Sequence, residues 1–298
     1  MSEPAAAGAG EQSGEQSRSD AGGSPRVVPD VALIGAMKAG STTLFRRLEQ
    51  HPAIAVGGSK EPSYFSDDVN FARGPDWYRS QLSAGPGLRC DASVQYSDPQ
   101  FAPVAMRRLR EANPDVRLVF VVRHPVERLR SHYRHQVQRS RERRPLADAV
   151  LDPANPYVRR SRYAPTLTAV DQAFAREQLL VVHTGQLDQD ETWDEILRHL
   201  GVASVPRPTD VRNEGADKMG FRPTTLALWE RGWGRRAKRV PKPLRSMGRP
   251  LFMRRDKAYD ELKAQAAAPL PQSVVDVLAE DAQAFSAGLG WPQCPWSF

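Results

Sequence analysis

The sequence predicts an α/β fold of three layers, α/β/α, in which helices cover both faces of a central, mostly parallel sheet. Two observations predict it. From Asp30 onward, short apolar runs alternate with segments of helical periodicity, as they do in chains of βαβ units. Several of these runs, such as Val31–Ile34 and Leu118–Val122, contain no alternating polar residues. This pattern is typical of strands that are buried on both faces of a parallel sheet.

The predicted strands are mostly short runs rich in Val, Leu and Ile, and the predicted helices have apolar residues at helical spacing. The predicted strands are Val31–Ala36, Leu88–Asp91, Val116–Val122 and Gln178–His183. The predicted helices are Thr42–Gln50, Trp77–Leu82, Pro99–Ala112, Pro125–Ser140, Ala164–Arg176, Thr192–Leu200 and Val274–Leu289. Pro125 takes the first helical position, where the fixed φ angle of proline is favourable. No internal repeat is visible, so the elements predict a single α/β unit.

The chain has 298 residues, enough for one large α/β domain or two small ones. Its first 29 residues are mainly Ala, Gly, Ser, Glu and Gln, which bury too little apolar surface to offset the entropy of ordering. We therefore predict a disordered leader at residues 1–29 and one domain at residues 30–298. The apolar runs fall far short of the ~20 residues of a membrane-spanning helix. Two distant cysteines, Cys90 and Cys294, argue against a disulfide framework, and we predict a cytoplasmic location.

The charge of the chain is basic, with 42 Lys and Arg against 35 Asp and Glu and a formal net charge of +7. This balance favours an anionic ligand or surface, without deciding between a nucleotide, a nucleic acid, a sulfated glycan and a lipid headgroup. A dense basic run lies between Arg231 and Lys257. It is either a surface for an anionic substrate or a membrane, or an irregular segment whose apolar residues pack on the core while its arginines extend to solvent. We favour the second interpretation.

The stretch GAMKAGSTTL, Gly35–Leu44, lies between the first predicted strand and the first predicted helix. Its two glycines have the spacing of a nucleotide phosphate loop, but Ser41 stands at the usual lysine position and Lys38 lies inside the loop. Such a turn binds anions because backbone N–H groups and the positive end of the helix converge on it. The alternative is an ordinary turn with a Ser or Thr cap. A lysine close to the positive helix end favours the anion site.

The strand that ends at Val122 predicts a second anion contact. A magnesium-dependent triphosphatase needs an acidic residue at the end of such a strand, but this strand is followed by Arg123, and the next ends in histidine and threonine. Ligands collect at the carboxyl ends of strands in doubly wound sheets. Arg123 with Ser131, about two turns into the following helix, would suit a phosphate monoester. The alternative is a surface arginine that pairs with Glu127.

Four motifs occur in a fixed order: GAMKAGSTTL, SKEPSYF (Ser59–Phe65), CDASVQY (Cys90–Tyr96) and VVRHPVERLRSHY (Val121–Tyr133). Together they resemble the sulfotransferases that use 3′-phosphoadenosine 5′-phosphosulfate (PAPS), in the branch that contains heparan-sulfate sulfotransferases and many bacterial relatives. The stretch Arg160–Leu187 and the closing GWPQCPW continue the resemblance, which covers the chain from about Asp30 to its end. The resemblance implies a fold like that of P-loop-containing nucleoside triphosphate hydrolases.

The resemblance also implies roles for individual residues. Lys38 would stabilise the charge that develops on the bridging oxygen of the donor, and Glu61 would be the general base for the acceptor hydroxyl. The alternative for Glu61 is a glutamate that caps a helix or forms an ion pair before Pro62. The residues implied in donor binding are Lys38, Ala39, Gly40, Ser41, Thr42 and Thr43 at the 5′-phosphate, Arg123 and Ser131 at the 3′-phosphate, Tyr163 near the 3′-phosphate side, and Lys218, Gly220 and Arg222 in a loop that closes over the donor.

The sequence departs from the family pattern at three positions. Ser63 stands where many relatives have histidine, so the base would be Glu61 alone or another group. Asp91 and Ala92 stand where heparan-type enzymes carry glutamate and lysine. These two departures count against heparan sulfate as the acceptor.

The expected protein is a bacterial, metal-independent sulfotransferase that transfers a sulfuryl group from PAPS to a hydroxyl group by in-line displacement. The acceptor would be a carbohydrate, a glycolipid or a small metabolite, with no nucleic-acid partner. Two alternatives stay open. One is a nucleotide kinase or triphosphatase with an unusual loop, and the other is a non-enzymatic binder of anions or nucleic acid that uses the basic run between Arg231 and Lys257.

Overall fold

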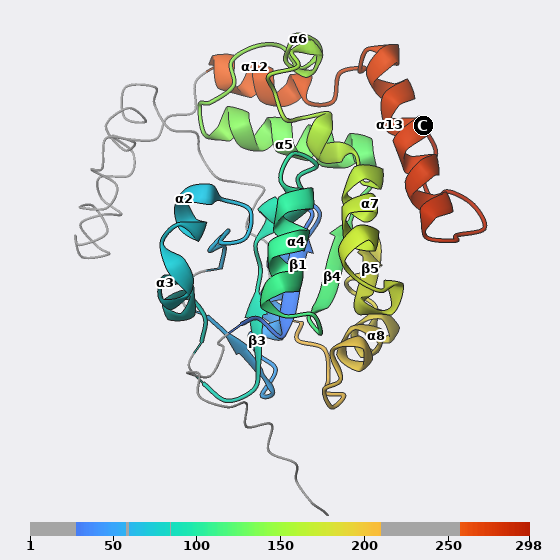
Figure 1. The fold of residues 1–298 in the computed structure, drawn as a ribbon. Helices are drawn as coiled ribbons and strands as arrows, with labels where there is room; N and C mark the ends of the chain where they lie inside the picture. Colours follow the sequence, from blue (N-terminus) through green and yellow to red (C-terminus); the bar gives the residue numbers. More distant parts are fainter. Residues whose placement is uncertain (1–27, 58–59, 84, 210–256) are drawn as a thin grey trace, which may run out of the picture.

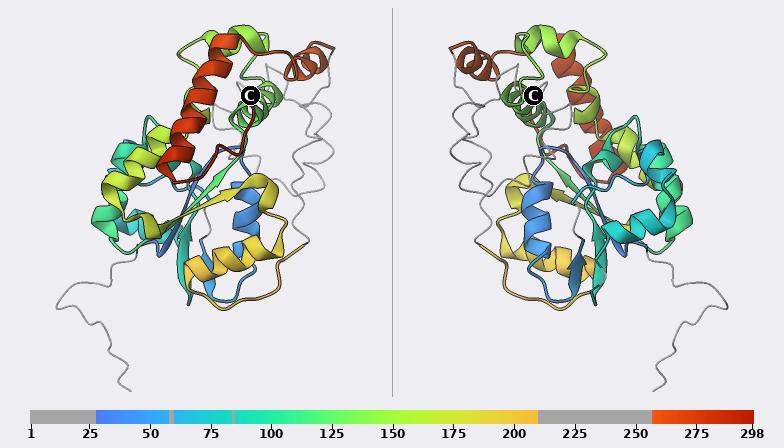
Figure 2. Two further views of the ribbon diagram at one scale, coloured as in Figure 1. Left: turned by 90° about the vertical axis from the view of Figure 1, so that its right-hand side faces the viewer. Right: turned by 90° about the vertical axis from the view of Figure 1, so that its left-hand side faces the viewer.

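The computed structural model describes residues 28–57, 60–83, 85–209 and 257–298. Within these residues, five strands form one parallel sheet in the order β2-β3-β1-β4-β5. Helices α4 and α7 cover one face of the sheet, and α1 and α8 cover the other (Figures 1 and 2). The predicted three-layer α/β/α fold is therefore confirmed.

The strands are short, and the central one is the most buried. Their bounds are β1 (Val31–Gly35), β2 (Ile54–Val56), β3 (Leu88–Asp91), β4 (Arg117–Val122) and β5 (Leu179–His183). Every residue of β1 is buried, because β1 has strands on both sides and helices on both faces. The sequence predicts four of these strands but not β2, whose three residues are too few to show a pattern.

The helices follow the predicted order. Their bounds are α1 (Ser41–Leu48), α2 (Asp68–Phe71), α3 (Gly74–Gln81), α4 (Ala102–Ala112), α5 (Pro125–Gln138), α6 (Leu146–Leu151), α7 (Ala164–Ala173), α8 (Asp190–Leu200), α12 (Lys257–Gln265) and α13 (Gln272–Gly288). The described part of the chain also contains the 3₁₀ turns η1 (Val94–Ser97), η2 (Arg159–Ser161), η3 (Arg176–Gln178) and η4 (Thr184–Gln186). Helices α2, α6 and α12 were not predicted.

Strand β1 is the point in the sheet at which the order of the strands changes direction. It pairs with β3 on one side and β4 on the other, so the connections that follow it run to opposite halves of the sheet. In such sheets, ligands bind at the carboxyl ends of the strands beside this point. The loop after β1, Asp91 at the end of β3 and Arg123 after β4 all lie at this edge.

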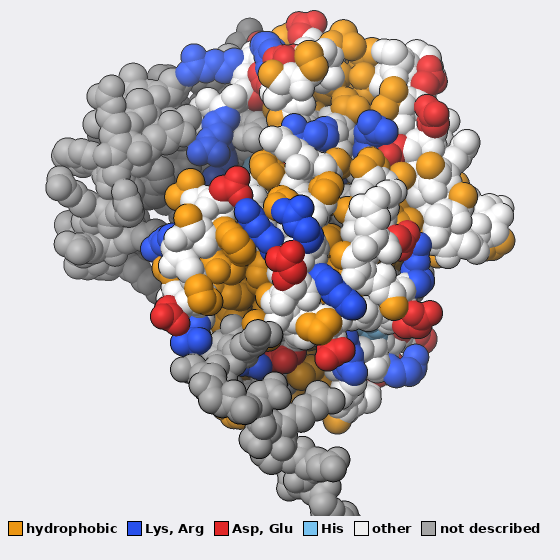
Figure 3. Space-filling view, viewed as in Figure 1, with side chains coloured by type: hydrophobic (Ala, Val, Ile, Leu, Met, Phe, Trp, Pro, Cys, Tyr) orange, Lys and Arg blue, Asp and Glu red, His pale blue; other side chains and the backbone are white. Residues whose placement is uncertain are grey.

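Several sequence predictions fall outside the described residues. They are the leader, apart from residues 28 and 29, the donor-binding residues Lys218, Gly220 and Arg222, and nearly all of the basic run. On the face shown in Figure 3, the described Lys and Arg side chains are interspersed with Asp and Glu side chains. None of the helices in the described part is both long and apolar enough to cross a bilayer.

Gly35, the last residue of β1, lies against the 3₁₀ turn η1. Its φ angle is 150°, and a Cβ atom built on it would lie 1.9 Å from Ser97 Oγ and 2.8 Å from Ser97 Cβ. A side chain at Gly35 would therefore push apart β1 and the turn that lines the pocket described below. The contact explains why glycine is required at this position.

We expect Gly35→Ala to lower the free energy of unfolding by roughly 2–4 kcal/mol, because steric overlap and an unfavourable φ angle act together. Gly74→Ala is the matched control. Gly74 also has a positive φ angle, 81°, but its added Cβ would meet no described atom within 4 Å, so we expect a loss of only about 1–2 kcal/mol. Urea unfolding of both variants measures the difference, and equal losses would show that the contact with Ser97 is unimportant.

Candidate functional site

The loop after β1 presents the N-terminus of α1 at the carboxyl edge of the sheet. Gly40 precedes α1 with a φ angle of 100° and has no side chain to cap the helix, and the first turn of α1 has no acidic residue. The positive end of the helix is therefore available to an anionic ligand. The backbone angle requires glycine, and a Cβ atom on Gly40 would lie 2.7 Å from Leu187 Cδ1, so the Leu187 side chain would have to move.

The loop is fastened to the neighbouring strands. Ala36 N–H donates to the Val121 carbonyl oxygen at 2.6 Å. The Thr184 hydroxyl lies within hydrogen-bond distance of the carbonyl oxygens of Ala39 and Val122. These contacts hold the loop beside the end of β4, and therefore beside Arg123.

The predicted residues of the loop differ in their exposure. Ala39 and Ser41 are buried, Thr42 is exposed, and Lys38, Gly40 and Thr43 are half-buried. Lys38 has a positive φ angle of 72°. The structure thus places the predicted loop residues around one helix end, and their contacts with the donor stay predictions.

Arg123 is half-buried, and its Nη2 donates to Glu127 Oε2 at 3.0 Å. The pairing that was the alternative interpretation of Arg123 is therefore present. It does not use all of the guanidinium, which has five N–H donors. Ser131 lies half-buried on helix α5. Arg123 itself lies in the short segment between β4 and α5, two residues before the helix begins.

Tyr163 lies beneath Arg123. Its side chain is buried, and its hydroxyl donates to the Arg123 carbonyl oxygen at 2.8 Å. Its ring packs with Phe120, Phe285 and Trp296. In this structure Tyr163 fixes the backbone of Arg123, so any effect on a ligand would pass through Arg123.

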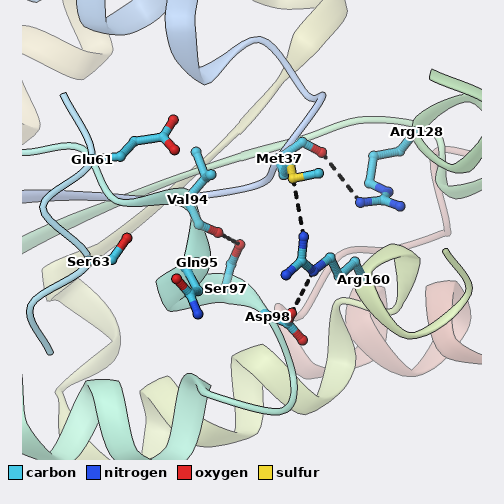
Figure 4. Close-up of a pocket in the computed structure, with 9 residues that line it drawn as sticks. All are labelled: Met37, Glu61, Ser63, Val94, Gln95, Ser97, Asp98, Arg128 and Arg160. Carbon is cyan, nitrogen blue, oxygen red and sulfur yellow. Dashed lines mark hydrogen bonds and ion pairs between the residues drawn. The ribbon is translucent and has the colours of Figure 1, made fainter. Parts of the chain in front are cut away.

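A pocket opens beside the loop, with a volume of about 170 Å³. This space is large enough for several water-sized polar groups. Its lining residues are Met37, Glu61, Ser63, Val94, Gln95, Ser97, Asp98, Arg128 and Arg160. Glu61 and Ser63 lie on one side of the pocket, and Arg128 and Arg160 lie on the other (Figure 4). All four motifs therefore contribute to one cavity or its immediate wall.

Arg128 is a wholly buried guanidinium with uncharged partners. It donates from Nε to Ser161 Oγ at 2.9 Å and from Nη2 to the Tyr157 carbonyl oxygen at 3.0 Å. Its Nη1 reaches the Met37 carbonyl oxygen at 3.5 Å. Burial lowers the pKa of Arg128 to about 10, so the side chain stays charged at neutral pH. A buried charge of this kind favours an anion in the pocket that it lines.

Asp98, on the same wall, joins two further arginines. Its carboxylate is buried and accepts hydrogen bonds from Arg159 Nε at 2.9 Å and from Arg160 Nε. Burial alone would raise the pKa of Asp98, but the hydrogen bonds of the two arginines outweigh burial and lower the pKa below its ordinary value. Of the residues that line the pocket on this side, Arg128 and Arg160 carry guanidinium groups and Asp98 carries a carboxylate. The surplus charge of this wall is positive.

Glu61 is the carboxylate of the opposite wall. Its side chain is 44% exposed, and Oε1 lies 2.7 Å from Lys60 Nζ. The segment that carries it has no helix or strand between Lys60 and Ser66. The Glu61 carboxylate is accessible to a small molecule in the pocket, as a proton acceptor must be.

Sequence reasoning did not identify Arg128, Arg160 or Asp98. Arg128 and Arg160 lie within motifs that the resemblance quoted, but only burial and distant partners distinguish them from the other arginines of those motifs. Among the residues that the structure describes, no group of three or more His, Cys, Asp and Glu side chains is placed to hold a metal ion.

His132 packs against Arg128 inside the protein. Its ring is wholly buried, and Nδ1 lies 3.2 Å from Arg128 Nη2. Burial, followed by the charge of Arg128, lowers the pKa of His132 to about 2. The ring is therefore neutral and accepts the hydrogen bond of Arg128 on Nδ1.

We expect His132 to make folding stability depend on pH. In the unfolded chain the ring takes up a proton below about pH 6.5, whereas the folded chain takes it up only near pH 2. The stability that this neutral ring contributes is therefore present above pH 6.5 and decreases by about 1.4 kcal/mol per pH unit below it. His132→Asn retains an acceptor for Arg128 but does not titrate.

The stability advantage of the natural chain over His132→Asn should thus shrink by about 2 kcal/mol between pH 7 and pH 5. Urea unfolding at both pH values measures it. A constant difference across this range would mean that His132 does not stay neutral in the folded protein.

No family model matches the sequence. The chain is 32% identical over 119 residues to heparan sulfate glucosamine 3-O-sulfotransferase 5 of Mus musculus, a match that covers 39% of this chain and 33% of that protein. It is 30% identical over 112 residues to bifunctional heparan sulfate N-deacetylase/N-sulfotransferase 1 of Caenorhabditis elegans, covering 36% and 13%. The chain thus spans a third or less of the length of these curated relatives.

The fold is similar to that of a solved sulfotransferase from Alicyclobacillus acidocaldarius. The TM-score is 0.58 at 19% sequence identity, and the match covers 89% of this chain and 97% of that one. At this identity the likeness concerns the fold, while the curated matches concern the sequence. Together they show that the chain is similar to sulfotransferases, in sequence over 39% of its length and in fold over 89% of it.

Proposed function

We propose that the chain transfers a sulfuryl group from PAPS to a hydroxyl group of an acceptor, without a metal ion. One observation carries the proposal: Met37 of the loop, Glu61 and Arg128 line the same pocket, although they come from three separate motifs. The curated relatives are named for sulfotransfer in heparan sulfate, which supports the reaction type and a carbohydrate as one acceptor class.

The site fits a donor with two phosphate positions. The uncapped end of α1 supports binding of the 5′-phosphate by Ala39, Gly40, Ser41, Thr42 and Thr43. Arg123 follows β4, the strand that pairs with β1, which supports binding of the 3′-phosphate by Arg123 with Ser131. Because the ends of these two strands are neighbours, one ligand could meet both anion sites.

PAPS would supply an activated sulfuryl group with a phosphate as its leaving group. A carboxylate oxygen of Glu61 would accept the proton of the acceptor hydroxyl, because this side chain is accessible on one wall of the pocket. The Lys38 ammonium group would offer positive charge where negative charge develops on the leaving oxygen. Arg128 and Arg160 would give the opposite wall a charge that suits an anionic sulfuryl group.

The identity of the acceptor, the cytoplasmic location and the bacterial origin stay predictions. The same is true of a role for Lys218, Gly220 and Arg222. The kinase or triphosphatase alternative would need an acidic residue at a strand end. Strand β4 is followed by Arg123 and β5 ends at His183, and Asp91, which ends β3, is buried and accepts hydrogen bonds from three hydroxyl groups. A binding protein without activity is the other alternative, and the experiments below distinguish all three.

Calorimetric titration tests the donor. We expect tight binding of adenosine 3′,5′-bisphosphate and weak binding of ATP, with or without magnesium. Arg123→Ala should weaken binding of the bisphosphate by roughly 10- to 100-fold, because it removes a charge-assisted hydrogen bond. Glu127→Gln is the control: it removes the partner of Arg123 at 3.0 Å and should retain or strengthen binding. Preferential, magnesium-dependent binding of ATP would instead favour the nucleotide kinase.

Sulfuryl transfer from radiolabelled PAPS to a panel of acceptors tests the chemistry. The panel contains a heparan-derived oligosaccharide, a glycolipid and a small alcohol, each with a metal chelator present. With the acceptor that works, Glu61→Gln should lower kcat by about 10²-fold or more, because the amide cannot take the proton. Lys38→Ala should lower kcat by about 10²- to 10³-fold.

Glu111→Gln is the control for the loss of a carboxylate, since Glu111 lies exposed on α4 beside Arg107, and it should leave kcat unchanged. Near-normal turnover of Glu61→Gln would refute its assignment as the base. Salt-sensitive binding that is indifferent to Lys38→Ala, with no transfer to any acceptor, would favour the binding protein.

A further inference from the structure

Asp91, at the carboxyl end of β3, is a buried carboxylate whose three side-chain partners are hydroxyl groups. It is 1% exposed. Oδ1 accepts a hydrogen bond from Ser93 Oγ at 2.6 Å, and Oδ2 accepts from the hydroxyls of Tyr96 and Tyr78, each at 2.7 Å. The three hydroxyl donors offset part of the cost of burying the charge. Neither the family resemblance nor the pocket lining assigns a function to this cluster.

Two of the three hydroxyls connect Asp91 to the segment that carries Glu61. Ser93 Oγ accepts a hydrogen bond from Ser63 N–H at 2.9 Å. The Tyr96 hydroxyl accepts from Phe65 N–H at 3.3 Å. One carboxylate is therefore linked, through two hydroxyl bridges, to the backbone on both sides of Tyr64.

The segment around Glu61 depends on such side-chain contacts. It forms no ladder or helix between Lys60 and Ser66, and Ser63 has a φ angle of 51°, in the left-handed region that costs free energy for a residue with a side chain. Its backbone N–H at Ser63 finds a partner in the bridge, and the Pro62 carbonyl oxygen accepts from Asn70 Nδ2 at 3.1 Å. These bonds fix the two residues that follow Glu61.

The carboxylate sets the direction of both bridges. A hydroxyl can donate one hydrogen bond and accept others. Because Asp91 accepts a hydrogen bond from each hydroxyl group, the lone pairs of the Ser93 and Tyr96 oxygens face the N–H groups of the segment. Without the charge at position 91, each hydroxyl could point its O–H group towards the backbone N–H of the segment. The two hydrogen atoms would then face each other, and the hydrogen bond from that N–H would be lost.

We propose that Asp91 is a positioning residue for Glu61, acting through the hydroxyls of Ser93 and Tyr96. The proposal rests on the proposed function, in which Glu61 takes the proton of the acceptor. A consistent feature is that the charge of Glu61 is among the causes that raise the pKa of Asp91, after burial as the main cause. The two carboxylates are thus within electrostatic reach of each other.

Substitution of Tyr78 is a control that distinguishes a positioning role of Asp91 from a purely structural one. Tyr78 donates to the same Oδ2 atom as Tyr96 and is equally buried. The Tyr78 hydroxyl donates its hydrogen bond to Asp91. The Tyr78 ring stacks on Tyr64 with 4.4 Å between the ring centroids, a contact that phenylalanine preserves. Tyr78→Phe therefore removes one hydrogen bond from Asp91 and leaves both bridges in place.

Amide hydrogen exchange of the full chain tests the bridges without any substrate. Ser93→Ala should speed exchange of the Ser63 amide, Tyr96→Phe should speed exchange of the Phe65 amide, and Asp91→Asn should speed both. The loss of one hydrogen bond predicts an increase of roughly fivefold at the affected amide. Tyr78→Phe should leave both amides unchanged.

Steady-state kinetics with the acceptor found in the panel tests the consequence for catalysis. Ser93→Ala, Tyr96→Phe and Asp91→Asn should lower kcat while the KM for PAPS stays unchanged, because the donor contacts lie elsewhere. Tyr78→Phe should retain kcat. The proposal would be overturned by unchanged exchange at both amides, or by a loss of kcat in Tyr78→Phe equal to that in Tyr96→Phe.

The two proposals fail in different ways. Exchange that changes as expected, in a chain that transfers sulfate to no acceptor, would establish the bridges and overturn the proposed function together with the catalytic meaning of Asp91. Transfer that depends on Glu61 but not on Ser93, Tyr96 or Asp91 would overturn only the positioning role.

Discussion

The parallel pairing of β1 with β3 and β4 is the constraint on which the site depends. Parallel strands end at the same edge of a sheet, so this pairing brings the loop after β1, Asp91 and Arg123 together from positions almost 90 residues apart in the sequence. Gly35 allows the end of β1 to pass close to Ser97. The backbone contact of Ala36 with Val121 then fixes the loop against β4. The pairing of the strands thus sets the positions of the site residues relative to one another.

The second property of this edge of the sheet is its positive charge, which the neighbouring protein groups do not fully neutralise. Arg128 is buried among a hydroxyl, carbonyl oxygens and a neutral imidazole. Hydrogen bonds of this kind satisfy the donors of a guanidinium but leave its charge uncompensated. Asp98 serves both Arg159 and Arg160. An anionic ligand in the pocket would complete this arrangement, which is the electrostatic reason why the site suits an anion better than a cation.

Much of the fold could be predicted from the sequence, because continuous apolar runs report burial on both faces of a parallel sheet. The loop could also be predicted, since its glycines, lysine and hydroxyls are adjacent in sequence. Strand β2 could not, because three residues carry no periodicity. Nor could the roles of Arg128 and Tyr163. Arg128 is buried because Tyr157 and Ser161, about 30 residues away, receive its hydrogen bonds, and local pattern does not reveal such partners.

The departures from the family pattern gain a common explanation in the structure. Ser63 stands where many relatives have histidine, and here its backbone, in the left-handed region, is held by Ser93. Because Ser63 has no imidazole, the titratable side chain on this wall of the pocket is that of Glu61. The position of its carboxylate depends on the backbone of the segment that carries it. Asp91 supplies the anchor for this backbone through two hydroxyls. Ser63 and Asp91 are therefore parts of one hydrogen-bonded unit, which on the proposed function would hold the backbone beside Glu61.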